Sequence, residues 1–312
     1  MDRRDFMRIS AAAVAAAAVS PAEAVAVSRK MTSKSLNRSD FNGVQVGTIT
    51  YSFGAQGSTA GDMLLFSLAS GVGSIELMSE SALSYTGTPA GTIDEWKLGT
   101  EEADKCLTRF RELGQIYRNA GVGIHILKFR PSAKTPVDAL DFMFEACKAI
   151  GADGLTTELD FATAEKVAPI ARKHGKYLIF HNHGQPANSD WQGFESYLKF
   201  GKNIMLNFDA GHYFGYTGKN PCEVVEKLHD RIYSIHLKDK TSIANIENPN
   251  KNMPWGQGET PLPQLLKLVQ SHSGETGWPV HCDIELEYDV PKDSTPVDEV
   301  ARCVEYCKTV LL

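Results

Sequence analysis

The sequence predicts a single-domain α/β protein with the (β/α)8 TIM-barrel architecture. Three observations lead to this expectation. Eight short apolar or β-branched runs recur along the chain, helical periodicity separates most of them, and polar residues gather at the ends of the later runs. A strand followed by a helix, repeated eight times, is the sequence form of this barrel. Because such a barrel needs about 250 residues, a chain of 312 residues requires no second domain.

The first 26 residues are predicted to be an export signal peptide. Residues 3–8 (RRDFMR) precede an uncharged, alanine- and valine-rich run from Ile9 to Val19, and A-x-A cleavage patterns end at Ala24 and Ala26. The arginine pair resembles the twin-arginine signal, although Asp2 stands where that signal usually has Ser or Thr. The apolar run is too short to span a membrane, which needs about 20 residues. We therefore expect a mature protein exported to the periplasm or cell envelope, with no membrane association after cleavage.

Residues 27–43 are polar and lack a sustained period, so they are expected to form a linker or lead-in before a barrel over residues 44–312. The eight expected strands are Val44–Tyr51, Gly73–Met78, Val122–Phe129, Gly154–Leu159, Tyr177–Asn182, Ile204–Asp209, Ile232–Leu237 and Val280–Leu286. Helical spacing of apolar residues is clear in Val137–Ile150 and Leu262–Val269. Glycines such as Gly151 and Gly175 suit left-handed helix ends before the next strand. An open, doubly wound sheet gives the same alternation, but the count of eight favours a closed barrel.

Composition limits the possible partners. The formal charge of -6 and the pI near 5.9 argue against a polyanion such as nucleic acid. A hydrophobic content of 42% is enough for a large core. The six cysteines show neither C-x-x-C nor zinc-ribbon spacing, so we expect buried thiols.

Polar and apolar side chains alternate in the last four expected strands. In a barrel strand, outward side chains pack on helices, inward ones face the axis, and the functional site lies at the C-terminal strand ends. The inward positions carry His181 and His183, then Asn207 and Asp209, then Ser234, His236 and Lys238, and finally Asp283, Glu285 and Glu287. Four consecutive strand ends thus direct carboxylates and imidazoles towards one axis.

A divalent metal ion is the simplest explanation for these polar strand ends. Carboxylates gathered in a barrel mouth are costly without a compensating cation or proton. A single strand-end histidine is more often a structural hydrogen-bonding group than a ligand, but four matching strands reverse that weighting. Carboxylates mixed with imidazoles suit Mn²⁺, Mg²⁺, Co²⁺ or Zn²⁺, and the oxygen-rich set disfavours a structural zinc.

The same motifs, taken in order, resemble the xylose isomerase-like superfamily, and especially its sugar phosphate isomerase/epimerase group. The motifs that carry the resemblance are Phe180–Gly184 (FHNHG), Phe208–His212 (FDAGH), Ile235–Asp239 (IHLKD), Gly256–Gly258 (GQG) and Asp283–Glu285 (DIE). The resemblance extends over nearly the whole chain after the signal peptide. It implies a TIM barrel with a metal-dependent activity on sugars.

In the ketose epimerases of this superfamily, a Glu, an Asp, a His and a Glu on strands five to eight hold the metal. The resemblance implies Asp209, His236 and Glu285 as the last three ligands. His181 stands where the first Glu belongs, and in the epimerases that Glu is also an acid/base group. The fourth ligand is then Glu158 of strand four, which we prefer, or His181 itself. A surface-facing Glu158 is the remaining alternative.

A metal ion of this kind polarises a substrate carbonyl and eases removal of the neighbouring proton. The predicted acid/base residues are His181, His183, Lys238 and Glu287. The predicted substrate contacts are Glu76, Lys128, His212 and Trp255, the last by stacking on a sugar ring. Lys238 can alternatively serve only as an ion-pair partner, Glu76 and Lys128 as rim charges, and Trp255 as loop packing.

These features predict a metal-dependent isomerase or epimerase that transfers a proton next to the carbonyl of a sugar or keto-sugar. The His-Asn-His strand and the export signal resemble envelope proteins that process keto-glycosides, so lyase or hydratase chemistry on the same site is the alternative. An AP endonuclease shares the barrel but uses a histidine-rich three-metal site on a basic surface, which the acidic charge disfavours. A non-catalytic carbohydrate-binding barrel would hold no stoichiometric metal. The sugar, its phosphorylation, the metal and the oligomeric state are left open.

Overall fold

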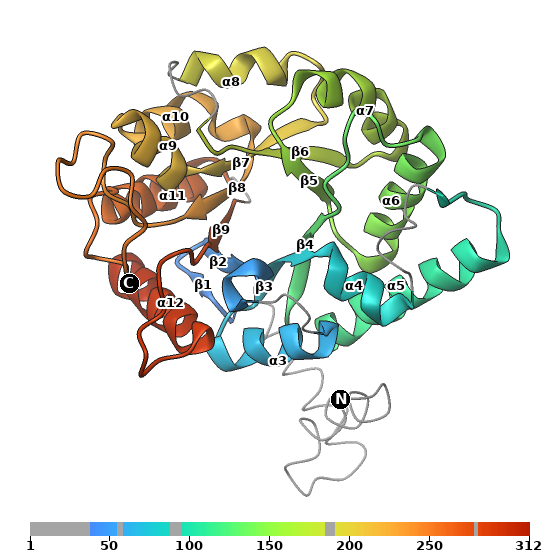
Figure 1. Ribbon diagram of the computed structural model, residues 1–312, viewed down its shortest axis with the longest axis horizontal. Helices are drawn as coiled ribbons and strands as arrows, with labels where there is room; N and C mark the ends of the chain where they lie inside the picture. The colour runs from blue at the N-terminus through green and yellow to red at the C-terminus, as the bar shows by residue number, and fades with distance from the viewer. Residues whose placement is uncertain (1–37, 55–58, 88–94, 185–190, 278–279) are drawn as a thin grey trace, which may run out of the picture.

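A computed structural model describes residues 38–54, 59–87, 95–184, 191–277 and 280–312. The predicted signal peptide and most of the lead-in lie outside the described residues. Nine strands form one sheet in chain order, and β2 also pairs with β9, which closes the sheet. All pairings among β2 to β9 are parallel. The predicted single-domain TIM barrel is confirmed, with the strands at the centre and the helices around them (Figure 1).

Each barrel strand is followed by at least one helix before the next strand begins. The strands are β1 Asp40–Phe41, β2 Val44–Ile49, β3 Ser74–Met78, β4 Gly123–Lys128, β5 Gly154–Glu158, β6 Tyr177–His181, β7 Ile204–Asp209, β8 Ile232–Leu237 and β9 His281–Ile284. The helices are α3 Ala60–Ser70, α4 Ser79–Thr86, α5 Glu101–Asn119, α6 Val137–Ile150, α7 Phe161–His174, α8 Trp191–Leu198, α9 Ala210–Thr217, α10 Pro221–Leu228, α11 Leu262–Thr276 and α12 Pro296–Leu311, with 3-10 turns η1 Thr50–Phe53 and η3 His229–Arg231. Every predicted strand is present, with ends that differ by at most a few residues.

The end of the predicted lead-in is part of the fold. Strand β1 pairs antiparallel with the start of β2. Next to it, the buried Ser39 hydroxyl accepts a hydrogen bond from the Gly73 backbone N–H at 2.9 Å and donates one to the Val46 carbonyl. The sequence lacks a period here because two residues of strand are too short to show one.

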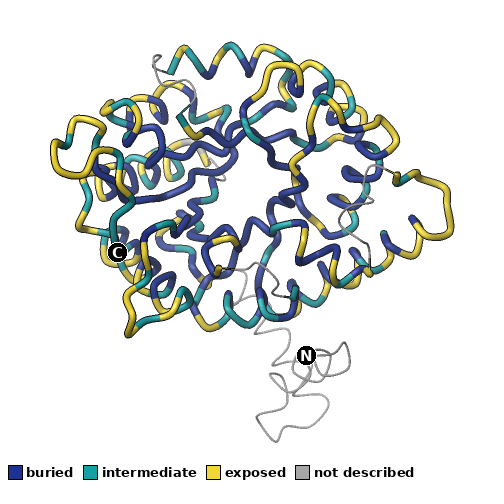
Figure 2. Tube along the Cα trace, viewed as in Figure 1, coloured by how far each residue is buried: buried dark blue, intermediate teal, exposed yellow. Residues whose placement is uncertain are grey.

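The hydrophobic core lies mainly between the sheet and the ring of helices. The outward residues of the last strands, for example Phe208, Ile235 and Ile284, belong to this core. A much smaller cluster of Ile126, Ile179 and Tyr233 forms a separate core group. Figure 2 shows buried chain at the centre and exposed chain at the outer edge. The alternation expected from the sequence is thus present, and burial of each large apolar side chain contributes roughly 1.5–3 kcal/mol.

Two positions need glycine for different reasons. Gly151 ends α6 in the left-handed conformation with φ 95°, as the sequence predicts. Gly47 of β2 lies at the seam of the barrel, where a Cβ atom would stand 2.3 Å from Asp283 Oδ1 and 2.7 Å from the Ser74 carbonyl oxygen. Only a residue without a side chain allows β2 to pair this closely with both of its neighbours.

All six cysteines are buried and unbridged, as the sequence predicts. Within the described part of the chain, no helix has both the length and the apolar character needed to cross a membrane.

Candidate metal centre

Four side chains from consecutive strands meet at the mouth of the barrel, the end where the barrel strands terminate. His181 ends β6, Asp209 ends β7, His236 lies near the end of β8, and Glu285 directly follows β9. All four are buried, and one ligand atom from each lies within 4.8 Å of the others. Ligand atoms on opposite sides of an ion at roughly 2.0–2.6 Å lie no more than about 5 Å apart. The mouth cluster, as we call these four residues, therefore has the dimensions of a single metal site.

Asp209 is oriented by the start of the helix that follows it. Its Oδ1 accepts the backbone N–H of His212 at 2.5 Å and so caps α9. The side chain of Asn182 holds the Asp209 backbone from the other side, accepting its N–H at 2.9 Å and donating to its carbonyl at 3.1 Å. These contacts leave Oδ2 directed into the mouth cluster.

His236 is oriented by a carboxylate beneath it. Its Nε2 lies 2.9 Å from Glu76 Oε2, and its Nδ1 lies 3.0 Å from Glu285 Oε2. Glu76 is fully buried and also accepts hydrogen bonds from Asn207 and Thr156 at 2.7 Å each. If Nε2 carries the proton that Glu76 accepts, Nδ1 presents its lone pair to the mouth cluster. Glu76 thus lies deeper than the rim or substrate-contact position that the sequence suggests.

The fourth position is filled by His181. Its Nε2 lies 3.4 Å from Asp209 Oδ2 and 3.6 Å from Glu285 Oε2. Glu158 lies on the other side of the ring, with Oε2 3.1 Å from Nδ1 and a side chain that is 41% exposed. Of the two alternatives for the fourth ligand, the geometry favours His181 over Glu158, the residue preferred from the sequence. Counting every second residue along a strand could not make this choice, because Glu158 and His181 each end a strand at a position that faces the barrel axis.

Lys238 neutralises part of the charge in the mouth. Its ammonium lies 2.7 Å from Glu287, 2.9 Å from Glu285 and 3.2 Å from Asp209, and donates to His212 Nε2 at 2.8 Å. Burial alone would lower the pKa of Lys238, but these carboxylates raise it above its ordinary value, so the ammonium stays charged. One ammonium against three carboxylates leaves two negative charges, which is the charge that a divalent cation compensates.

The pKa shifts show how the cluster is balanced by protons. Burial would raise the pKa of Glu285, but the Lys238 ammonium holds it well below its usual value. Burial would lower the pKa of His236, but Glu285 and Glu76 raise it to about 9. The pKa of His181 is also raised, by carboxylates that outweigh its burial. Protons on the two imidazoles therefore supply the positive charge that a metal ion would supply in their place.

Two buried atoms of the mouth cluster have unmet bonding capacity. Among the described residues, His181 Nε2 and Asp209 Oδ2 have no partner in hydrogen-bonding geometry, and their nearest charged contacts are each other at 3.4 Å and, for Asp209, the Lys238 ammonium at 3.2 Å. A buried polar atom without a partner is costly, so such atoms call for an explanation. The donor set, its size, its charge and these two atoms all fit a divalent metal ion held by two imidazoles and two carboxylates.

The remaining predicted acid/base residues lie around the cluster. His183 follows β6 with a side chain that is 49% exposed and a ring stacked on His212 at 4.6 Å. Burial lowers the pKa of His212 to about 4, so this imidazole is neutral near pH 7. Glu287 is half-buried and pairs with Lys238. His183 and Glu287 are thus open to a ligand in the mouth.

The other two predicted substrate contacts are Lys128, which lies beneath the mouth cluster, and Trp255, which lies further from it. Lys128 is buried, with its ammonium 3.8 Å from both Glu76 and Glu158. Trp255 packs edge-on against Tyr306 of α12, with ring centroids 5.5 Å apart. Their contact with substrate stays a prediction.

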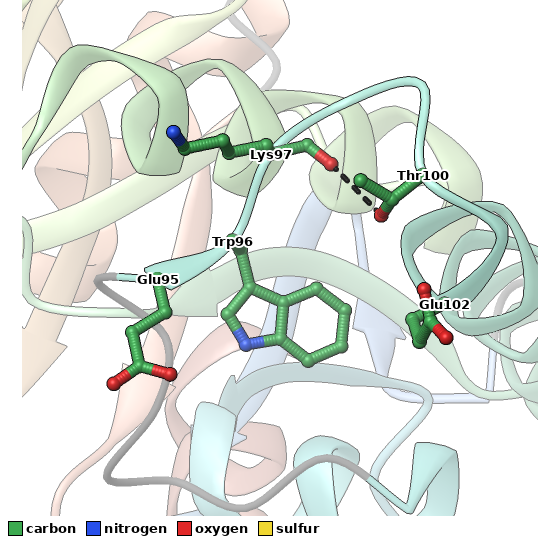
Figure 3. A pocket seen from close by; sticks show the side chains of 5 residues that line it. All are labelled: Glu95, Trp96, Lys97, Thr100 and Glu102. Atoms are coloured by element: carbon green, nitrogen blue, oxygen red, sulfur yellow. Dashed lines mark hydrogen bonds between the residues drawn. The ribbon is translucent and has the colours of Figure 1, made fainter.

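Two hollows differ in their relation to this chemistry. The hollow in Figure 3, of about 350 Å³, is lined by Glu95, Trp96, Lys97, Thr100 and Glu102 and shares no residue with the mouth cluster. A larger hollow of about 620 Å³ is lined by Tyr51, Asn252 and Glu287 among others. Of these two hollows, the second adjoins the mouth cluster, because Glu287 in its lining pairs with Lys238.

Sequence reasoning missed a second polar layer inside the barrel. His125 donates through Nε2 to Asp283 at 2.8 Å, and the Ser74 hydroxyl bridges His125 at 2.9 Å and His281 at 3.1 Å. The two imidazole rings stack at 4.0 Å. We call these four residues the lower layer, because Asp283 precedes Glu285 by two positions on the same inward face. The signal that could have found it is the same alternation, followed towards the start of each strand.

Fold and site together define a TIM-barrel protein with a buried set of side chains at the mouth that suits a divalent ion. The chain belongs to the xylose isomerase-like TIM barrel family, which matches residues 76–307.

Curated relatives are similar over part of their length. An inosose dehydratase of Clostridium botulinum (strain Alaska E43) is 24% identical over 157 residues, which are 46% of this chain and 51% of that protein. An inosose dehydratase of Mesomycoplasma hyopneumoniae (strain J) is 23% identical over 160 residues, 47% of this chain and 52% of that protein. The chain thus spans about half the length of the curated relatives it matches.

Solved structures show the same fold at low identity. The IOLI protein with a bound zinc atom has a TM-score of 0.58 and 14% identity, with 86% of this chain and 99% of that chain covered. A probable 3-DHS dehydratase, AsbF of Bacillus anthracis, has a TM-score of 0.60 and 13% identity, with 84% and 98% covered. These likenesses concern the fold alone.

Proposed function

We propose that the protein is a metal-dependent enzyme that transfers a proton next to the carbonyl of a sugar or keto-sugar, with isomerisation or epimerisation as the outcome. The observation that carries the proposal is the mouth cluster, with its surplus of two negative charges and its two unpartnered atoms. His181, Asp209, His236 and Glu285 would hold a divalent ion, which would supply polarisation of the substrate carbonyl. The choice among Mn²⁺, Mg²⁺, Co²⁺ and Zn²⁺ stays open.

The four predicted acid/base residues divide into two pairs. His181 belongs to the mouth cluster as a ligand, and three carboxylates keep Lys238 positively charged. His183 and Glu287 are left to move protons, since both are accessible at the mouth and each contacts His212. We assign His183 as the base that removes the α-proton and Glu287 as the second acid/base group.

The permanently charged Lys238 has a different role. Its ammonium stabilises negative charge that develops on the substrate oxygen as the proton leaves, and it is pre-oriented by Glu285 and Glu287. Glu76 holds the ring of His236 from below and touches no substrate.

Exchange of the substrate α-proton with solvent tests this proposal. The metal-loaded protein in D₂O should place deuterium next to the carbonyl of an unphosphorylated keto-sugar, even without net turnover. If the base is shielded from solvent, a primary isotope effect with the α-deuterated substrate should appear instead. Absence of both signals with every substrate processed would reject proton abstraction.

A lyase is the second candidate, because the curated relatives are dehydratases by name. Elimination begins with the same proton removal and then needs an acid for the departing hydroxyl, a role that Glu287 can fill. The two outcomes are separated by the product, since dehydration gives an unsaturated ketone with new ultraviolet absorbance and epimerisation does not.

We also propose that the protein is exported by a twin-arginine-type signal in residues 1–26. The support is the charge and apolar pattern of the sequence alone. Replacing Arg3 and Arg4 by lysine should keep the protein inside the cell, while a chain that begins at residue 27 should keep the thermal stability and metal content of the full chain. A large loss of either in the shortened chain would show that the segment is structural.

A further inference from the structure

We propose that the hollow beside Glu287 binds an uncharged sugar ring linked to the reacting sugar, so that the substrate is a glycoside and not a sugar phosphate. This inference rests on the proposed function. The hollow measures about 620 Å³, which is within the usual range for ligand pockets of roughly 300–1,000 Å³. It is therefore large enough for a group beyond the reacting sugar.

The hollow opens at the same end of the barrel as the mouth cluster. Tyr51 of η1 follows β2, Glu287 follows β9, and Asn252 lies in the connection between β8 and α11. A carboxylate oxygen of Glu287 lies within 4.8 Å of ligand atoms of Glu285 and His212. A sugar whose carbonyl reaches the mouth cluster thus has Glu287 beside it and the hollow directly beyond.

The charge of the lining opposes a phosphate group. Its described residues include the Glu287 carboxylate and no Lys, Arg or His. The nearby Lys240 is buried and points its ammonium at Asn252 Oδ1, 2.8 Å away. A dianionic phosphate placed here would meet the Glu287 carboxylate, and the two nearby ammonium groups, Lys238 and Lys240, lie behind the lining and are engaged with Glu287 and Asn252. Phosphate sites in proteins instead direct arginine, lysine or helix N-termini at the phosphate.

The chemistry of the lining suits a neutral ring. Tyr51 presents an aromatic side chain that is 47% exposed, and Leu286, Val290 and Pro296 add apolar surface. The Nδ2 group of Asn252 makes only long hydrogen bonds, at 3.3 Å to the carboxylate and to the carbonyl of Glu287, so a ligand hydroxyl can replace one of these acceptors. A sugar ring has apolar C–H faces for the first kind of surface and hydroxyl edges for the second.

The test compares three keto-sugars that share the reacting ring: a methyl glycoside, a glycoside with a second hexose ring, and a 6-phosphate. The readout is kcat/KM for α-proton exchange by the metal-loaded enzyme. We expect the second ring to raise kcat/KM at least tenfold, mainly through KM, and the phosphate to lower it below that of the methyl glycoside.

Two substitutions at one position sharpen the test. Tyr51→Ala should remove the advantage of the second ring and leave the methyl glycoside unchanged. Tyr51→Lys should remove the same advantage and raise kcat/KM for the phosphate. Phe161→Ala is the matched control, because Phe161 is 46% exposed on α7 and does not line the hollow. It should change none of the three substrates.

The outcomes separate this inference from the proposed function. Equal kcat/KM for one and two rings, or a preference for the phosphate in the wild-type protein, would overturn the inference while leaving proton transfer in place. Failure of exchange with all three substrates would instead overturn the proposed function.

Discussion

Two polar groups in the described barrel interior are built from similar residue types, and one of them, the mouth cluster, has the properties of a metal site. The mouth cluster and the lower layer both combine histidines with strand carboxylates, and Asp283 and Glu285 are neighbours on one inward face. In the lower layer a chain of hydrogen bonds runs from the Asp283 carboxylate to His125, from His125 to Ser74 and from Ser74 to His281. At the mouth cluster, Asp209, Glu285 and the adjoining Glu287 outnumber the Lys238 ammonium, so protons on the imidazoles or a metal ion must balance the remaining charge. Residue type alone therefore does not identify a site.

The lower layer does contain one oxygen without a hydrogen-bond partner, Asp283 Oδ1. The backbone of Gly47 packs against it so closely that even a Cβ atom would stand 2.3 Å away. Glu76, His236 and Asp283 also lie within 4.8 Å of one another, but both Glu76 oxygens already accept hydrogen bonds. In the mouth cluster, by contrast, two facing atoms, His181 Nε2 and Asp209 Oδ2, lack a partner in hydrogen-bonding geometry, and no backbone contact of the kind made by Gly47 is seen at either of them.

The largest predicted effect comes from replacing a single atom of the mouth cluster. Glu285→Gln keeps the shape of the side chain but removes the charge that holds the cation, so metal binding and α-proton exchange should both be abolished. Metal analysis and the exchange assay check this. Asp283→Asn, two residues earlier, is the matched control and should retain both. Loss of metal in the control alone would assign the ion to the lower layer.

The next effect separates chemistry from metal binding. His183→Asn should leave the metal content unchanged and slow exchange by about 10²- to 10⁴-fold, the usual contribution of a general acid or base. The pH profile of kcat/KM should lose the limb that belongs to the base. Retention of near-full exchange would transfer the role of base from His183 to Glu287.

A smaller effect is expected from Glu76, which lies between the mouth cluster and the lower layer. Glu76→Gln removes the carboxylate that orients His236 and should weaken metal affinity by about 10- to 100-fold, as substitutions behind metal-bound histidines do. At saturating metal, kcat should return close to the wild-type value. A persistent loss of kcat would show that Glu76 takes part in the reaction directly.

The smallest effect concerns stability and pH in the lower layer. Burial and the neighbouring His125 lower the pKa of His281 well below 6.5. As pH falls through the unfolded value of about 6.5, the unfolded chain gains a proton that the folded chain refuses, so this group destabilises the fold at low pH. The loss is at most about 2 kcal/mol between pH 6.5 and 5.

Urea unfolding of the wild-type protein and of His281→Asn at pH 7.5 and 5.0 measures this difference. The substituted protein should lose less free energy of unfolding over that interval. In the metal-free protein the raised pKa of His236 acts in the opposite direction, since its contribution is full below about 6.5 and is lost as pH rises through about 9. An identical pH response of the two proteins would show that His281 titrates normally.

The sequence was sufficient for the barrel and for most of the residues at its mouth, because strand-end alternation is a local pattern. Asp209, His236 and Glu285 could be grouped from period 2 and the rule that a barrel site lies at the strand ends. The choice of His181 over Glu158 as the fourth ligand could not be made from the sequence, since it depends on which side of the His181 imidazole the Glu158 carboxylate lies. The buried position of Glu76 depends likewise on the depth of β3 in the barrel, which no spacing reveals.

The central claim is that one divalent ion is held by His181, Asp209, His236 and Glu285. Anomalous X-ray diffraction from crystals of the protein loaded with Mn²⁺ or Zn²⁺ tests it most directly. We predict a single strong peak at the barrel mouth, roughly 2.0–2.6 Å from His181 Nε2, Asp209 Oδ2, His236 Nδ1 and a Glu285 oxygen. A peak coordinated by Glu158 and His183 instead, or no peak at the mouth, would contradict the claim.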